Sequence, residues 1–136
     1  MINFTSNTNF QLRNKTDLKS WIKKVVGKEG WQMKDLCFVF CDDMDLLDKN
    51  SKYLNHDAFT DILTFEYSEN NNIAGDIYIS IDRVKENAKT YKVTFENELN
   101  RVMIHGVLHL LGYKDNSKKE HKIMREKEDF YLRLQT

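Results

Sequence analysis

Proline is absent from this chain of 136 residues, and glycine occurs only five times. Turns and helix ends must therefore be marked by Gly, Asn and Asp, and the Asn-rich residues 69–72 predict a turn. No apolar run approaches the roughly 18 residues that a membrane helix requires, so we expect no membrane partner. The first residues lack a charged region followed by an apolar one, which predicts no secretory signal and a cytoplasmic location.

An excess of basic charge is missing as well. Lys and Arg together number 21, as do Asp and Glu, so the formal net charge is zero. Proteins that depend mainly on nucleic-acid phosphates usually carry a basic excess. This balance argues against a high-affinity binder driven by charge alone, but it leaves room for a local basic patch.

Cysteine is scarce, with Cys37 and Cys41 alone in the chain. On a strand these two residues share a face, and at about 3.3 Å per residue they lie too far apart for a disulfide. We therefore expect two buried, reduced thiols, which agrees with a cytosolic protein.

The remaining pattern predicts one α+β domain over residues 1–136, with a small mixed sheet of about four strands packed against helices. We expect strands at 3–5, on a sheet edge, at 36–41, and at 62–67 and 76–81, which form an antiparallel hairpin. We expect helices at 16–28 and 45–53, one capped by Asp82, and one at 95–111. A last helix starts at Asn116 or Ser117, with Ser117 and Glu120 at capping-box spacing. The last helix has five apolar candidates for its inner face: Ile123, Met124, Phe130, Tyr131 and Leu134.

The helix at 95–111 differs from the others, because residues 102–111 are almost all apolar apart from His105, Gly106 and His109. A helix that is apolar all round is buried on most sides, so this one is expected at the centre of the fold. Gly112 ends it, since glycine readily adopts the positive φ of a helix terminus.

The two histidines predict a metal site. Four residues apart on a helix, His105 and His109 lie on one face and can both bind one zinc ion. By itself this spacing is equally typical of two core histidines. Gly112 allows the chain to turn back, however, and Asp115 then supplies a third ligand. Three protein ligands leave a fourth position for water, which is the catalytic arrangement, so the full spacing favours a zinc centre.

This spacing reproduces the zincin motif H-E-x-x-H-x-x-G-x-x-H with two departures. Gly106 replaces the glutamate that acts as general base in metallopeptidases, which argues against peptide hydrolysis. The missing side chain either leaves room for a substrate or permits close helix packing. Asp115 replaces the last histidine, and His121 is its rival as third ligand, although the glycine turn favours Asp115.

Residues 105–115 resemble the signature H-G-x-L-H-L-x-G-Y-D-H of the bacterial rRNA-maturation endoribonucleases, the YbeY family. The glycine after the first histidine and the Gly-Tyr pair make this match specific. Two further family blocks are recognisable at Asn50, Tyr53, Asp57 and residues 60–65, and at residues 75–77. The resemblance extends from about residue 35 to the end of the chain.

The resemblance implies a zincin-like fold with one Zn²⁺ ion at His105, His109 and Asp115. It implies cleavage of single-stranded RNA, in maturation of the 3′ end of small-subunit rRNA and in ribosome quality control. The implied partners are the small ribosomal subunit and ribosomal or assembly-factor proteins. Beyond a metal-bound water the sequence assigns no catalytic group; Asp61 and Asp76, near strand ends, are candidate bases for which capping or turn roles are favoured.

One further departure concerns RNA binding. Many members of the family carry an arginine after the tyrosine that corresponds to Tyr53, where this chain has Leu54. If that arginine holds an RNA phosphate, another cation must replace it here. The candidates are His56, Lys114, Lys118 and Lys119, although a solvated surface role is favoured for each lysine.

Three functions therefore compete. The first is a zinc-dependent endoribonuclease that matures rRNA. The second is a ribosome-assembly or RNA-binding factor in which zinc is mainly structural. The third is another metallohydrolase, against which Gly106 counts.

Overall fold

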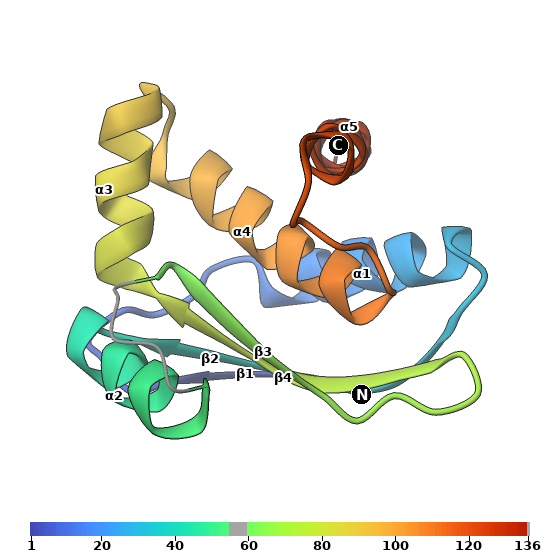
Figure 1. The fold of residues 1–136 in the computed structure, drawn as a ribbon, viewed down its shortest axis with the longest axis horizontal. Coiled ribbons are helices and arrows are strands. Elements are labelled where there is room, and N and C mark those ends of the chain that lie inside the picture. Colours follow the sequence, from blue (N-terminus) through green and yellow to red (C-terminus); the bar gives the residue numbers. More distant parts are fainter. Residues whose placement is uncertain (55–59, 136) are drawn as a thin grey trace.

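A computed structural model describes residues 1–54 and 60–135, and the side chains of residues 50–54 lie outside its described part. Within these ranges the chain forms a four-stranded mixed sheet and five helices (Figure 1), which confirms the predicted α+β class. None of the described helices is long and apolar enough to cross a membrane.

The sheet has the strand order β1-β2-β4-β3. Its strands are β1 (Ile2–Ser6), β2 (Gln32–Cys41), β3 (Ile62–Glu66) and β4 (Asn72–Ser80). β2 pairs in parallel with both β1 and β4, whereas β3 runs antiparallel to β4. The predicted edge position of β1 and the predicted hairpin of β3 and β4 are therefore confirmed.

Helices cover both faces of this sheet (Figure 1). They are α1 (Lys15–Lys28), α2 (Asp43–Leu54), α3 (Ile81–Tyr91), α4 (Phe95–Leu110) and α5 (Lys118–Arg133). α1 and α4 pack on one face, and their apolar side chains join those of β2 and β4 in the main core. α2 lies on the other face, where Leu46 packs with Cys41 and Leu63. α5 packs on the outer side of α4.

Of the three predicted helix-end residues, Ser117 and Gly112 have the predicted role and Asp82 does not. The capping box of Ser117 and Glu120 opens α5, and Gly112, with a φ of 103°, follows the end of α4. The predicted Asp82 cap is wrong, because α3 begins earlier and the Ser80 hydroxyl accepts from the Arg83 amide. Asp82 instead accepts from the Asp43 amide at 3.0 Å, at the start of α2.

The inner face of α5 is narrower than its apolar pattern predicts. Met124, Glu128 and Tyr131 are buried, at the i, i+4, i+7 spacing of a single stripe. Ile123 and Phe130 fall beside this stripe and are 39% and 43% exposed, so their predicted burial is wrong. A charged residue thus occupies an inward position that an apolar residue would normally fill.

The two cysteines are free, as expected, but only Cys41 is fully buried. Cys37 is half-buried on β2. The prediction of two buried thiols therefore holds for Cys41 alone.

Candidate metal centre

The site is built on α4, which lies against β3 and β4. His105 and His109 stand one turn apart on this helix, with ring centroids 4.5 Å apart. After Gly112 the chain turns back and brings Asp115 to the same place. One ligand atom from each of these three residues lies within 4.8 Å of the others.

Two nitrogens and one carboxylate oxygen are a donor set that suits a zinc ion. Ligand atoms at about 2.0–2.2 Å from a tetrahedral zinc lie roughly 3.4 Å from one another, so the three groups need to move only slightly. His105, His109 and Asp115 are therefore placed, and chemically suited, to hold one metal ion.

A buried carboxylate orients His105. The imidazole Nδ1 lies 2.6 Å from an oxygen of Glu128, whose second oxygen accepts from Arg101 at 2.9 Å. Arg101 also donates to Asp129 at 2.7 Å. With its proton on Nδ1, His105 turns a free Nε2 toward Asp115, at 3.7 Å. A carboxylate behind a histidine in this way fixes the tautomer and raises its basicity as a metal ligand.

A backbone carbonyl orients His109. Its Nδ1 lies 3.0 Å from the Tyr113 oxygen, and because a carbonyl only accepts, the proton belongs on Nδ1. The Tyr113 hydroxyl in turn donates to Glu29 at 2.5 Å. Glu29 also accepts from Lys127 at 3.1 Å and from Tyr131. The turn that positions Asp115 is thus tied to both α1 and α5.

The two histidines differ in their protonation. Burial opposes the charged form of His105, but the hydrogen bond and charge of Glu128 outweigh it and raise the pKa of His105. Burial and the charge of His105 lower the pKa of His109. Burial therefore favours the neutral form of His109, which is the form that binds a metal, whereas Glu128 favours the protonated form of His105.

The rival third ligand stands outside this group. His121 is on α5, its side chain is 61% exposed, and its Nδ1 contacts the Asp115 oxygen that does not face His105. The structure therefore brings Asp115, rather than His121, together with the two histidines of α4.

Gly106 faces the sheet. A Cβ placed on it would lie 2.8 Å from Ile62 Cδ1 and 2.9 Å from Ile77 Cγ2. Of the two interpretations offered by the sequence, close helix packing is the one the structure supports. The missing side chain opens no space for substrate, because it would point between β3 and β4.

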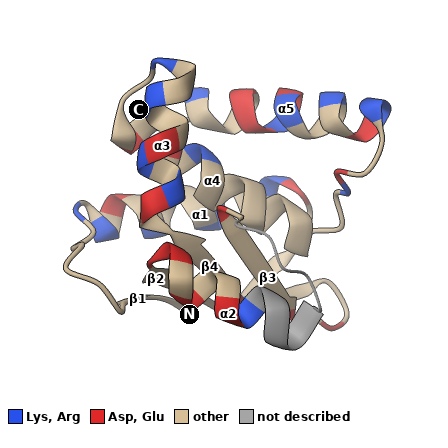
Figure 2. Cartoon of the chain, turned by 60° about the vertical axis from the view of Figure 1, so that its left-hand side comes forward, with Lys and Arg blue, Asp and Glu red and all other residues tan. Residues whose placement is uncertain are grey.

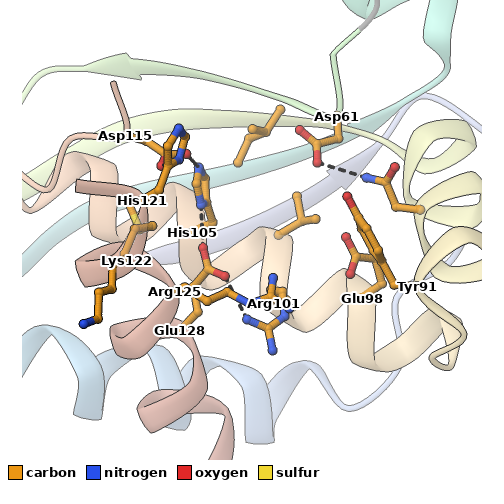
Figure 3. A pocket seen from close by; sticks show the side chains of 14 residues that line it. Asp61, Tyr91, Glu98, Arg101, His105, Asp115, His121, Lys122, Arg125 and Glu128 are labelled. Atoms are coloured by element: carbon orange, nitrogen blue, oxygen red, sulfur yellow. Dashed lines mark hydrogen bonds and ion pairs between the residues drawn. The ribbon is translucent and has the colours of Figure 1, made fainter. Parts of the chain in front are cut away.

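A cavity of about 560 Å³ adjoins the centre (Figure 3). His105 and Asp115 line one end, and Asp61, Tyr91 and Glu98 line the other. Its volume is typical of ligand pockets, which occupy about 300–1,000 Å³. The candidate metal centre therefore opens into a space large enough for part of a substrate.

At the end of the cavity away from His105, the polar side chains include Asp61, Asn87 and Glu98. An oxygen of Asp61 accepts from Asn87 Nδ2 at 3.2 Å. Burial raises the pKa of Asp61, and burial together with the charge of Asp61 raises that of Glu98. Asp76, the other candidate base, lies away from the cavity and accepts from the Tyr67 hydroxyl at 3.2 Å.

The cations suggested as substitutes for the family arginine do not line this cavity. Lys114, Lys118 and Lys119 are exposed and stand outside its walls. His56 and Asp57 fall outside the described residues, as do the side chains of Asn50, Tyr53 and Leu54.

The sequence interpretation missed Glu128 and Arg101. The one available signal was that a glutamate interrupts the apolar positions of the last helix, midway between Met124 and Tyr131.

Known proteins match nearly the whole chain. A family model described as Endoribonuclease YbeY matches residues 2–135. A relative of that name from Flavobacterium psychrophilum is 49% identical over 134 residues, covering 98% of this chain and 96% of its own. Another, from Karelsulcia muelleri, is 50% identical over 132 residues, covering 97% and 94%. A solution structure from Thermotoga maritima superimposes with a TM-score of 0.69 at 31% identity, covering 99% of this chain and 89% of the other. These matches agree with the resemblance of residues 105–115, and the chain belongs to the endoribonuclease YbeY family.

Proposed function

We propose that this chain is a zinc-dependent endoribonuclease that cleaves single-stranded RNA. Its relatives carry the name Endoribonuclease YbeY, and the observation that carries the proposal is the grouping of His105, His109 and Asp115 at one end of a cavity. Its role is maturation of rRNA, at the 3′ end of the small-subunit RNA, and ribosome quality control. We infer that its partners are the small ribosomal subunit and ribosomal or assembly-factor proteins. We infer also that residues 1–136 act as one domain in the cytoplasm.

Zinc fits the donor set because it accepts imidazole nitrogen and carboxylate oxygen in a site with three protein ligands. When bound, it would supply Lewis-acid chemistry toward a phosphoryl oxygen and activate water. The protein itself contributes orientation. Glu128 holds the Nδ1 proton of His105, and the Tyr113 carbonyl holds that of His109.

The site also contains a carboxyl group that could take part in proton transfer during hydrolysis of a phosphodiester. Asp61 faces the cavity across from His105, and its raised pKa allows it to hold a proton closer to neutral pH than an ordinary aspartate does. A peptidase lacks support, because Gly106 stands where the general base of zincin peptidases would be and faces the sheet.

The test pairs zinc analysis of the purified protein with cleavage of single-stranded rRNA fragments. Wild-type protein should hold one zinc ion and cleave, and a chelator should abolish cleavage. His109→Ala should lose both zinc and cleavage while its circular dichroism stays unchanged. If chelation instead melts the fold and no preparation cleaves RNA, zinc is structural and the protein is an assembly factor.

A further inference from the structure

Two cations on α5 line the cavity beside the metal centre. Lys122 and Arg125 are three residues apart, so they stand on one face of the helix (Figure 3). Both are exposed, and neither makes a hydrogen bond or ion pair with the residues that the structure describes. The charge of Arg125 acts on Glu98 and partly offsets the rise in its pKa, but no hydrogen bond or ion pair joins the two described side chains. These two side chains are therefore available to a ligand.

The other cations near the site are already engaged or stand elsewhere. Arg101 is bonded to Glu128 and Asp129. Lys127, also on α5, pairs with Glu29 at 3.1 Å. Acidic and basic side chains alternate along α5 (Figure 2). The presence of a cation on this helix therefore does not by itself indicate a ligand site. What distinguishes Lys122 and Arg125 is that they reach its wall unpaired.

The charge of the cavity shows why these cations matter to an anionic substrate. Its lining includes four carboxylates, from Asp61, Glu98, Asp115 and Glu128, and three cationic side chains, from Arg101, Lys122 and Arg125. With all of them ionised and a divalent ion in place, the net charge is plus one. Without Lys122 and Arg125 it would be minus one, and the cavity would repel a phosphodiester.

We propose that Lys122 and Arg125 bind the backbone phosphates of the RNA strand next to the cleaved bond. This inference rests on the proposed function and names the residues that position its substrate. The guanidinium of Arg125 offers a planar fork to two phosphate oxygens, and Lys122, whose ammonium points away from His105 (Figure 3), offers a point charge on a flexible side chain.

The test compares two double variants in the zinc-loaded protein. Lys122→Ala/Arg125→Ala removes the proposed contacts. Lys119→Ala/Arg133→Ala removes one lysine and one arginine from exposed positions of the same helix that lie outside the cavity. Both change the net charge equally. Binding of a labelled single-stranded RNA of mixed sequence is followed by fluorescence anisotropy over a series of salt concentrations, with cleavage of the same RNA measured in parallel.

The cavity variant should bind about tenfold more weakly for each cation lost, as expected for charge-assisted hydrogen bonds. Its salt dependence should be shallower by about 1.4 on the logarithmic scale, at about 0.7 for each phosphate contact on a single strand. The loss should be the same for different RNA sequences, and KM should rise while kcat stays close to wild type. Zinc content should not change.

Two results would overturn the assignment: unchanged affinity and salt dependence in the cavity variant, or an equal loss in the Lys119/Arg133 variant. Because wild-type cleavage is measured alongside, the two proposals can fail separately. Chelator-sensitive cleavage with no effect of Lys122 and Arg125 removes only this inference. RNA binding that depends on both residues, without any cleavage, supports phosphate binding by Lys122 and Arg125 but removes the proposed enzymatic function.

Discussion

Replacing Glu128 by glutamine should weaken zinc binding while the fold is retained. The carboxylate is 4% exposed and uses one oxygen for each of two donors, His105 Nδ1 at 2.6 Å and Arg101 at 2.9 Å. Glutamine has nearly the same shape but only one acceptor oxygen, so its amide NH₂ must face one of these donors. Either His105 loses the partner that fixes its tautomer, or Arg101 loses a charged partner.

The size of the effect follows from the hydrogen bond that is lost. A hydrogen bond to a charged group contributes about 1.5–3 kcal/mol, and loss of the carboxylate behind a metal-binding histidine typically weakens metal affinity about 10–100-fold. Those factors correspond to about 1.4–2.8 kcal/mol, in agreement with the loss of one such bond. We expect Glu128→Gln to bind zinc about 10–100-fold more weakly, as measured by competition with a chromophoric chelator.

Glu126→Gln is the matched control, because Glu126 is an exposed glutamate on the same helix and its replacement changes the net charge equally. It should bind zinc as wild type does. The metal-free forms of all three proteins are compared by thermal unfolding, which separates a loss of ligand orientation from a loss of fold. If Glu128→Gln binds zinc within twofold of wild type, Glu128 does not orient the ligand and the argument fails.

Three further outcomes are expected. Asp115→Ala should lose stoichiometric zinc and His121→Ala should keep it, by metal analysis after dialysis; the reverse result would make His121 the third ligand. Gly106→Ala should destabilise the protein by about 1–3 kcal/mol in urea unfolding, because its Cβ meets two isoleucines closer than 3.0 Å. Gly27→Ala, with open space around it in a helix, should stabilise by about 0.5–1 kcal/mol, and equal effects of the two would contradict the packing argument. Burial opposes ionisation of Glu29, but its three hydrogen bonds outweigh burial and lower its pKa, so its contribution is present above the unfolded value of 4.5 and is lost as pH falls through the folded pKa. The stability difference between wild type and Glu29→Gln should therefore shrink on acidification, and a constant difference from neutral to acid pH would contradict it.

Much of the fold is predictable here because local patterns and tertiary packing agree. The run of apolar residues around His105 and His109 predicts a buried helix, and α4 is buried on most sides. Gly112 adopts the positive φ that the turn requires, and the turn brings Asp115 to the histidines. These features depend on spacing along one segment of chain, which periodicity and turn chemistry describe well.

The residues that sequence alone does not reveal are those whose role depends on a distant segment. Glu128 follows His105 by 23 positions and Arg101 by 27, and only the packing of α5 on α4 places its carboxylate between them. On a helix considered alone, Glu128 resembles any solvated glutamate, and the apolar pattern therefore included Ile123 and Phe130 in the inner face but left Glu128 out. Burying a charge is costly unless it is paired. A glutamate inside an apolar stripe therefore indicates that the facing helix carries hydrogen-bond donors or cations that pair with it. Here those donors are an arginine and a histidine of the candidate metal centre, which makes the buried carboxylate part of the site and not only of the core.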